Sequence, residues 1–392
     1  MNIVYVLHSN MSLAGASKSF KILLKGVMDN GVHPIVVLPD KGDLYKELKL
    51  LNIPMYVTTY RPNTYTYSKT VKDVLLYVPR MFARLYVNHK AVKHLANFLK
   101  DKKIDLIHTN VSVINIGFKV SRVLGIPHVY HIREYGDKDF HLHYFPNKAA
   151  LLHQLEMPDS YSICITKDIQ EYHKQIGKAQ SRVIYNGICS AKDDNNQQID
   201  KDNYFLYVGR LEKTKGIEEL IDAFAEYIQN AQQKFPLYIL GTTENNSYEK
   251  KLKDMVCQNN IQLSVHFLGE RKDVDKIMQK ARAIIISSYQ EAFGRCMAEA
   301  MFNRCLVVAR DSGGLKEQFD NALDMGTQEI GLRFQNKQQL VDHLCEISSK
   351  SNEYYNQMIE KAFSFVHKLY TIEAYISQIE AFYQDILNHR IQ

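Results

Sequence analysis

The 392-residue sequence is poor in glycine and proline, and it has no long apolar run. The 18 Gly and 9 Pro exclude collagen-like and low-complexity chains. The 25 Tyr and 17 Phe exclude a disordered chain, because they supply ample apolar area to bury. No stretch approaches about 18 uninterrupted apolar residues, so we expect no transmembrane span. At roughly 150 residues per domain, the length predicts two domains.

Cysteine is also scarce. The six Cys all follow residue 163, and no two of them form a CxxC pair. We therefore expect neither a disulfide framework nor a zinc site, and the pattern favours reduced thiols in the cytosol. The first eight residues lack the basic start and small-residue cleavage site of a signal peptide and are read as a strand. These features predict a cytoplasmic protein.

Short β-branched runs alternate with helical patterns along the whole chain. The runs are continuously apolar, which is typical of strands buried on both faces of a parallel sheet. In the first half we expect strands at 3–7, 34–38, 53–58, 104–108, 127–132, 162–166 and 182–186. In the second half we expect them at 204–208, 237–240, 264–268, 283–287, 305–309 and 331–334. The predicted class is α/β, with doubly wound parallel sheets.

A polar segment without apolar periodicity, 189–203, separates the two halves and is predicted to be a linker. It divides the chain into two Rossmann-like β/α/β domains, 1–188 and 204–370. The last segment, 371–392, is expected to be a helix that crosses back to the first domain. Since open parallel sheets bind ligands at the carboxyl ends of their strands, we expect a deep cleft between the domains.

Charge is distributed unevenly between the halves. Residues 1–190 carry 25 Lys and Arg against 14 Asp and Glu, whereas the remainder carries 24 against 29. A basic first half and an acidic second half predict different partners for each.

The first of three segments with candidate chemistry follows an expected strand. Gly209 permits a tight turn, and Arg210 and Lys215 then precede a helical pattern at 217–229. A guanidinium and an ammonium beside a helix N-terminus form a good diphosphate site. Two solvated cations on a loop are the alternative.

The second segment follows the expected strand 283–287. Glu291 and Glu299 are a little over two helical turns apart, and a helix is expected to begin near Gly294. The carboxylates could accept hydrogen bonds from sugar and ribose hydroxyls, or they could lie on a solvated helix face. The free backbone amides expected at the helix start are those of Phe293, Gly294, Arg295 and Cys296.

The third segment contains Gly313-Gly314 and, three residues on, Glu317. Paired glycines let the backbone approach a ligand closely, and Glu317 is expected to begin or cap the next helix. A plain strand-to-helix turn is the alternative.

Together these segments resemble the retaining GT-B glycosyltransferases of family 4, group 1. The second domain of that family has the pattern G-R-x(3,4)-K-G, then E-x₇-E, then G-G-x-x-E, in the order and spacing seen here. The first half resembles the family in four further segments: the loop from Gly15, the D-x-I-H strand at 105–108, the H-x-x-E strand end at 131–134, and 183–187. The resemblance covers essentially the whole chain and implies a GT-B fold.

The resemblance implies a role for each site residue. Arg210 and Lys215 hold the donor diphosphate and stabilise its charge as the sugar leaves. Glu291 contacts the transferred sugar together with the amides of residues 293–296, and Glu299 accepts from the nucleotide ribose. The remaining implied contacts are the base beside Glu270 and Arg271, the diphosphate beside Gly15, and the donor sugar beside His131.

The implied reaction is a front-face substitution with retained anomeric configuration from a UDP- or GDP-linked sugar, without a metal or other cofactor. Asp137-Lys138-Asp139 spells a DxD metal motif, but we read it as a surface loop. The chain departs from the family pattern at four places: Ala16, Ala292, the pair Arg295 and Cys296, and the turn at 240–243. None of these departures removes a charged group.

The implied acceptor is a saccharide, on a lipid-linked precursor of a bacterial cell-surface polysaccharide. Residues 68–103 hold nine Lys and Arg interleaved with apolar and aromatic side chains. This stretch could lie on an anionic membrane, at the inner face of the plasma membrane, or it could be a core-packed helix with a solvated basic face. No motif supports binding of nucleic acid.

Three other functions fit the sequence less well. A nucleotide-sugar epimerase of the same fold class is disfavoured by the combination of G-R…K-G with E-x₇-E. A non-catalytic nucleotide- or sugar-binding protein is disfavoured because both the cation pair and the carboxylate pair are present. A dinucleotide oxidoreductase is excluded because no G-x-G-x-x-G follows the first strand.

Overall fold

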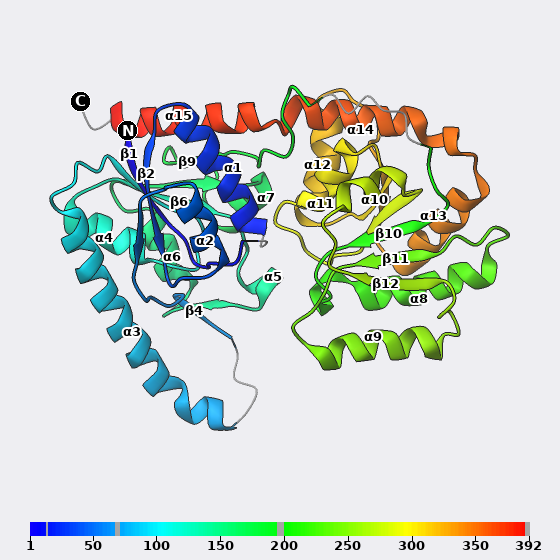
Figure 1. Cartoon of the computed structure of the whole chain (residues 1–392), viewed down its shortest axis with the longest axis horizontal. Helices are drawn as coiled ribbons and strands as arrows, with labels where there is room; N and C mark the ends of the chain where they lie inside the picture. Colours follow the sequence, from blue (N-terminus) through cyan, green and yellow to red (C-terminus); the bar gives the residue numbers. More distant parts are fainter. Residues whose placement is uncertain (13–14, 67–70, 194–199, 389–392) are drawn as a thin grey trace. The chain divides into compact units, whose positions relative to one another are not determined.

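The computed structural model describes residues 1–12, 15–66, 71–193 and 200–388, with side chains of the third range described from residue 75 (Figure 1). The chain divides into two compact units. Unit 1 comprises Met1–Gly187 together with Ile372–Gln392, and unit 2 comprises Ile188–Thr371. The segment expected as a linker, 189–203, falls within unit 2.

Unit 1 contains a seven-stranded parallel sheet in the order β3-β2-β1-β5-β6-β8-β9. The strands are β1 (Asn2–Val6), β2 (His33–Leu38), β3 (Met55–Val57), β5 (Leu106–Thr109), β6 (His128–Ile132), β8 (Ser160–Cys164) and β9 (Ser181–Val183). Each overlaps one of the seven runs expected from the sequence, with bounds that differ by at most three residues. A small antiparallel pair, β4 (Thr64–Tyr65) with β7 (His143–Tyr144), was not foreseen.

Helices cover both faces of this sheet. On β1, Ile3 and Tyr5 pack in a core cluster with residues of α1 (Gly15–Asp29) and α15 (Ile372–Asn388). Val4 and Val6 alternate with them, are fully buried and face the opposite side. The other helices of the unit are α2 (Asp43–Leu50), α3 (Val71–Leu99), α4 (Ile116–Leu124), α5 (Asp137–Phe140), α6 (Lys148–Leu155) and α7 (Lys167–Tyr172).

The C-terminal helix α15 is part of the unit 1 core. It lies so close to α1 that a Cβ added at Gly26 would be 2.4 Å from the side chain of Ile376. Its buried face carries Tyr375, Ile376, Ile379, Phe382, Tyr383 and Ile386. The first unit is therefore built from two segments far apart in the sequence.

Unit 2 contains a six-stranded parallel sheet in the order β12-β11-β10-β13-β14-β15. Its strands are β10 (Phe205–Val208), β11 (Leu237–Leu240), β12 (Val265–Gly269), β13 (Ala283–Ile286), β14 (Val307–Arg310) and β15 (Leu332–Phe334). Its helices are α8 (Ile217–Asn230), α9 (Asn246–Gln258), α10 (Val274–Lys280), α11 (Arg295–Phe302), α12 (Gly313–Asp324), α13 (Lys337–Ser349) and α14 (Asn356–Leu369), with short 3₁₀ turns at Lys213–Lys215 and Asn352–Tyr355. The predicted α/β class with two parallel sheets is confirmed.

In the described part of the chain, no helix combines the length and the hydropathy required to cross a bilayer. The six cysteines are all free thiols.

Candidate active site

Two of the predicted segments meet because β10 and β13 are neighbouring parallel strands. The loop after β10 carries Lys215, and the loop after β13 carries Glu291. Their side chains form an ion pair of 2.6 Å between Nζ and Oε1, and each is 21% exposed. The carboxyl edge of the unit 2 sheet thus holds a partly buried pair of opposite charges that solvent still reaches.

Two serines directly after β13 hold this pair in place. Ser288 donates from its hydroxyl to Oε1 of Glu291 at 2.8 Å, and Ser287 donates to the carbonyl oxygen of Lys215 at 2.8 Å. Sequence reasoning missed both serines, although their position directly after a buried strand was a usable signal.

Gly216 allows the two loops to approach each other. Its φ is +65°, and a Cβ there would lie 2.1 Å from the carbonyl oxygen of Ser287. A non-glycine residue would therefore be strained and would also push the Lys215 loop away from β13. Gly216, the last residue of the G-R…K-G segment, is therefore needed for the close packing of the two loops.

The third predicted segment, with Gly313 and Gly314, contacts the second one, with Glu291. The amide of Gly314 donates to the carbonyl oxygen of Glu291 at 2.7 Å, and a Cβ at Gly314 would lie 2.7 Å from Cα of Phe293. The sequence predicted that the paired glycines let the backbone approach a ligand, whereas the close approach in the structure is that of Gly314 to the Glu291 loop. Helix α12 begins at Gly313, so Glu317 lies inside the helix and does not begin or cap it. The expectation for Glu317 was wrong because the paired glycines enter the helix.

Helix α11 begins at Arg295, directly after Gly294, as the sequence predicts. Gly294 has a φ of +83°, and Gln318 donates to its carbonyl oxygen and to that of Phe293. Phe293 is buried, with its ring 5.2 Å from that of Tyr370. The loop before α11 is thus held by side chains from outside it.

The two departures from the family pattern at the start of α11 have defined contacts. Arg295 forms an ion pair of 3.0 Å with Glu299 one turn later. The Cys296 thiol faces the carbonyl oxygen of Val208 at 3.6 Å, and burial raises the pKa of this thiol well above its ordinary value. Cys296 is therefore a neutral thiol that contacts the end of β10, not a reactive thiolate.

Arg210 and Arg271, the other two predicted cations beside the donor, each form an ion pair with an acidic residue close in sequence. Arg210 is 56% exposed and pairs with Glu212 at 2.8 Å. Arg271 pairs with Asp273 at 2.8 Å, and both are exposed. Glu270 follows the edge strand β12, and β11 lies between that strand and β10.

In unit 1, Gly15 is the first residue of α1. His131 lies inside β6 and is fully buried, and burial lowers its pKa well below the ordinary value. Its Nδ1 is 3.2 Å from Nη2 of Arg133 and 3.3 Å from Nε2 of His108. Arg133, which follows the strand within the same H-x-x-E match, was not singled out from the sequence.

The carboxylates of the DxD tripeptide accept hydrogen bonds from the protein itself. Asp139 accepts from the backbone amides of Tyr135 and Gly136, and Asp137 accepts from the hydroxyl of Tyr172. Among the described residues, no group of three or more His, Cys, Asp or Glu is arranged to hold a metal ion.

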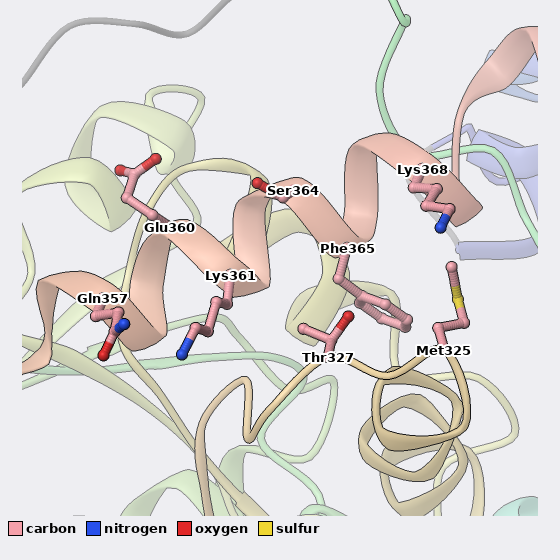
Figure 2. A pocket seen from close by; sticks show the side chains of 8 residues that line it. All are labelled: Met325, Thr327, Gln357, Glu360, Lys361, Ser364, Phe365 and Lys368. Atoms are coloured by element: carbon pink, nitrogen blue, oxygen red, sulfur yellow. The ribbon is translucent and has the colours of Figure 1, made fainter.

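A shallow hollow of unit 2 lies elsewhere, between α14 and the chain after α12 (Figure 2). It is lined by Met325, Thr327, Gln357, Glu360, Lys361, Ser364, Phe365 and Lys368. None of the predicted site residues is among them, so this hollow is separate from the candidate site.

Relatives of the chain were found by both sequence and structure. An uncharacterized glycosyltransferase of Methanocaldococcus jannaschii is 25% identical over 305 residues, covering 76% of this chain and 81% of the relative. A Campylobacter jejuni protein named GalNAc-alpha-(1->4)-GalNAc-alpha-(1->3)-diNAcBac-PP-undecaprenol alpha-1,4-N-acetyl-D-galactosaminyltransferase is 22% identical, covering 60% of this chain and 65% of that protein. The crystal structure of Anabaena HepE with UDP and glucose has a TM-score of 0.76 at 20% identity, covering 98% of this chain and 100% of that one.

Two family models match adjoining parts of the chain. The one described as Glycosyltransferase Family 4 matches residues 13–192, which include Gly15 and His131. The one described as Glycosyl transferases group 1 matches residues 190–365, which include the Lys215–Glu291 pair. With both parallel-sheet units present and both models matched in sequence order, the chain belongs to the group 1 glycosyltransferases of family 4, which have the GT-B fold.

Proposed function

We propose that this glycosyltransferase moves a sugar from a UDP- or GDP-linked donor to a saccharide acceptor, with retention of the anomeric configuration and without a metal ion. The Lys215–Glu291 ion pair carries the proposal. It lies at the carboxyl edge of the unit 2 sheet and beside the loop that leads into α11. A cation, a carboxylate and a helix N-terminus are the groups that a sugar diphosphate needs.

Donor binding in this proposal exchanges partners within existing ion pairs. Without substrate, Lys215 pairs with Glu291 and Arg210 pairs with Glu212. A diphosphate, with its greater negative charge, takes over both cations. Glu291 is then released to accept hydrogen bonds from the sugar hydroxyls. In the same way, Glu299 exchanges Arg295 for the ribose.

The chemical step uses the leaving group as the base. The bond between the anomeric carbon and the donor phosphate oxygen breaks while the acceptor oxygen attacks from the same face. The acceptor hydroxyl gives its proton to the departing phosphate oxygen. Arg210 and Lys215 stabilise the charge that develops on the diphosphate, the task that other glycosyltransferases give to a metal.

The proposed acceptor is a lipid-linked saccharide of a cell-surface polysaccharide, handled at the cytoplasmic face of the membrane. The name of the Campylobacter relative states an undecaprenyl diphosphate-linked acceptor, which supports this class. A further support is helix α3, whose first half extends away from the sheet of unit 1 (Figure 1).

Helix α3 has a different environment in each half. Ala91, Leu95 and Leu99 of the second half are buried in unit 1. In the first half, exposed apolar side chains recur at helical spacing: Leu75, Val78, Phe82 and Tyr86. Exposed Arg80 lies among them, and exposed Lys90 follows Tyr86 by one helical turn. We propose that this first half rests on anionic lipid.

The donor site is tested by thermal shift with UDP, GDP, ADP and their common sugars, with and without EDTA. We expect one nucleotide to stabilise the protein, the shift to survive EDTA, and Arg210→Ala and Lys215→Ala to abolish it. Lys213→Ala is the matched control, because Lys213 lies in the same 3₁₀ turn and is exposed. Absence of any nucleotide shift, or a shift that requires a divalent ion, would contradict the proposed donor site.

Two further measurements separate the remaining functions. Slow hydrolysis of the donor without acceptor is expected of an enzyme and not of a binding protein. An epimerase would change the configuration of the donor sugar, whereas the proposed reaction yields a product with the donor's anomeric configuration, which NMR can assign.

A further inference from the structure

Arg133 is a buried cation at the carboxyl edge of the unit 1 sheet. It directly follows β6, and only 8% of its surface is exposed. Its Nε donates to the carbonyl oxygen and to Oδ1 of Asn110, at 3.2 and 3.1 Å, and Nη1 donates to Oδ1 of Asn186 at 2.7 Å. Its Nη2 lies 3.3 Å from the hydroxyl of Tyr375 and 3.2 Å from Nδ1 of His131. Every one of these partners is uncharged or an imidazole.

The imidazoles near Arg133 do not supply a negative charge. A guanidinium only donates, so Nδ1 of His131 accepts and its Nε2 carries the proton. That Nε2 has no partner among the described residues. His108 can then accept a hydrogen bond from the Tyr383 hydroxyl on Nδ1, at 2.7 Å, and its Nε2–H shares Nδ1 of His131 with Arg133. Burial and the Arg133 charge both lower the pKa values of these two histidines, so the imidazoles remain neutral.

No carboxylate in the described part of the chain forms an ion pair with Arg133. The adjacent Glu134 is turned to Ser112, whose amide and hydroxyl both donate to its Oε1, at 2.6 and 2.7 Å. A buried charge without a counter-charge is unfavourable, and such groups concentrate at functional sites. The guanidinium therefore has no ion-pair partner among the described residues, although its charge opposes the rise that burial causes in the pKa of the neighbouring Glu134.

The surroundings of Arg133 also favour an anion. Asn110, which holds the guanidinium, donates from Nδ2 to the carbonyl oxygen of Ala16 at 3.3 Å. This contact ties Arg133 to the first turn of α1, a 15-residue helix with no acidic residue in that turn. The partial positive charge of the helix start thus adds to that of the guanidinium.

We propose that Arg133 and the first turn of α1 bind a phosphate oxyanion of a substrate, and that fully buried His131 is a positioning residue that holds Arg133. The contacts above use four of the five guanidinium N–H groups, and the second N–H group of Nη1 can donate to a phosphate oxygen. The inference rests on the proposed function, whose substrates offer two sources of this chemistry: the nucleotide diphosphate of the donor and the diphosphate of a lipid-linked acceptor.

The test compares Lys215→Ala with the double variants Lys215→Ala/Arg133→Gln and Lys215→Ala/Arg133→Lys. The shared background removes the diphosphate contact proposed for unit 2. Calorimetry with pyrophosphate, UDP and farnesyl diphosphate is expected to show about ten-fold weaker binding for the Gln variant and a smaller loss for the Lys variant, for pyrophosphate and at least one other probe. Loss with UDP identifies the donor, and loss with farnesyl diphosphate identifies the acceptor. Equal affinities of all three proteins for every probe would overturn the proposal.

Arg122→Gln is the matched control, because Arg122 of α4 also donates to carbonyl oxygens, those of Pro158 and Asp159. Its affinities should equal those of the background. If the Arg133 variants do not fold, hydrogen exchange of the Lys215→Ala protein gives the answer without them. Pyrophosphate should slow exchange in 15–29 and 128–136, and unchanged exchange there would overturn the proposal. Failure of the proposed function is distinguishable, because it appears as UDP binding that Lys215→Ala does not weaken.

Discussion

Lys215 and Glu291 are 76 residues apart in the chain, yet their ion pair joins the two loops that carry them. The pair also illustrates why a site residue can have two functions. Glu291 satisfies the cation while the site has no substrate, and it becomes available to a sugar once a diphosphate replaces it. Loss of either member is therefore expected to affect both donor binding and turnover.

Lys215→Ala should lower kcat/KM for transfer by about 10²–10³-fold, since it removes a preorganised charge beside the leaving diphosphate. Steady-state kinetics with the nucleotide sugar identified by thermal shift provides the measurement. Lys213→Ala should stay within about two-fold of the parent protein. A Lys215→Ala enzyme with unchanged kcat/KM would remove this residue from the mechanism.

Gly216→Ala should destabilise unit 2 by at least about 3 kcal/mol, because a left-handed φ and a backbone clash act together. Gly269 provides a matched comparison, since its φ of +66° is nearly the same but no atom lies within 4 Å of a Cβ added there. Gly269→Ala should lose only about 1–2 kcal/mol. Urea unfolding of the two variants measures the difference, and equal losses would show that the contact with Ser287 contributes nothing.

Among the elements, α3 has two halves that differ in burial, a difference that its sequence pattern does not reveal. The sequence offers two interpretations of residues 68–103, a membrane-bound stretch or a core-packed helix with a solvated basic face. The described part of α3 has a buried second half and an exposed apolar first half. Because the two halves differ in burial, a variant in the exposed first half should change lipid binding, and a variant in the buried second half should change stability.

Phe82→Ser should weaken binding to anionic vesicles about ten-fold, since it removes an exposed ring that can enter the lipid interface. Phe82 is 67% exposed, so the melting temperature should change little. Leu95→Ala is the control for the buried half. It should lower stability by about 2–5 kcal/mol without a specific effect on vesicles. Equally poor sedimentation of the parent protein with anionic and neutral vesicles would rule out the membrane proposal.

For the whole molecule, the fully buried histidines are concentrated in one unit. His108, His128, His131 and His173 are all in unit 1, and burial is the main cause that lowers the pKa of each. The pKa falls to about 3 for His108 and to about 4 for His173. In the unfolded chain these groups take up protons below about pH 6.5. Their contribution to stability is therefore present above that pH and is lost as the pH falls toward 4.

Acidification should accordingly unfold unit 1 before unit 2. Glu134 acts in the opposite direction, because burial raises its pKa to about 7 and its contribution grows as the pH falls from 7 toward 4.5. Four histidines outweigh one carboxyl, so the net loss should reach several kcal/mol. Hydrogen exchange between pH 7 and 4.5, corrected for intrinsic rates, measures each unit separately. Equal loss of protection in both units would contradict the prediction.

Much of the fold follows from local sequence. The thirteen strands of the two parallel sheets each overlap the apolar run expected for them, because strands buried on both faces require continuous apolar sequence. The loops that carry Lys215 and Glu291 were found in the same way, since each directly follows such a run. The β4–β7 pair was missed because two residues per strand leave no pattern to detect.

The sequence by itself determined the two parallel-sheet units, the family and the charged loops of unit 2, because periodicity and motif spacing are properties of neighbouring residues. Only the tertiary structure decided the strand order, the pairing of Lys215 with Glu291 and the side chains against which α15 packs in the unit 1 core. It also decided that His131 is enclosed while Arg133 lies at the sheet edge with uncharged partners. These properties depend on contacts between residues far apart in the chain, and no local pattern encodes them.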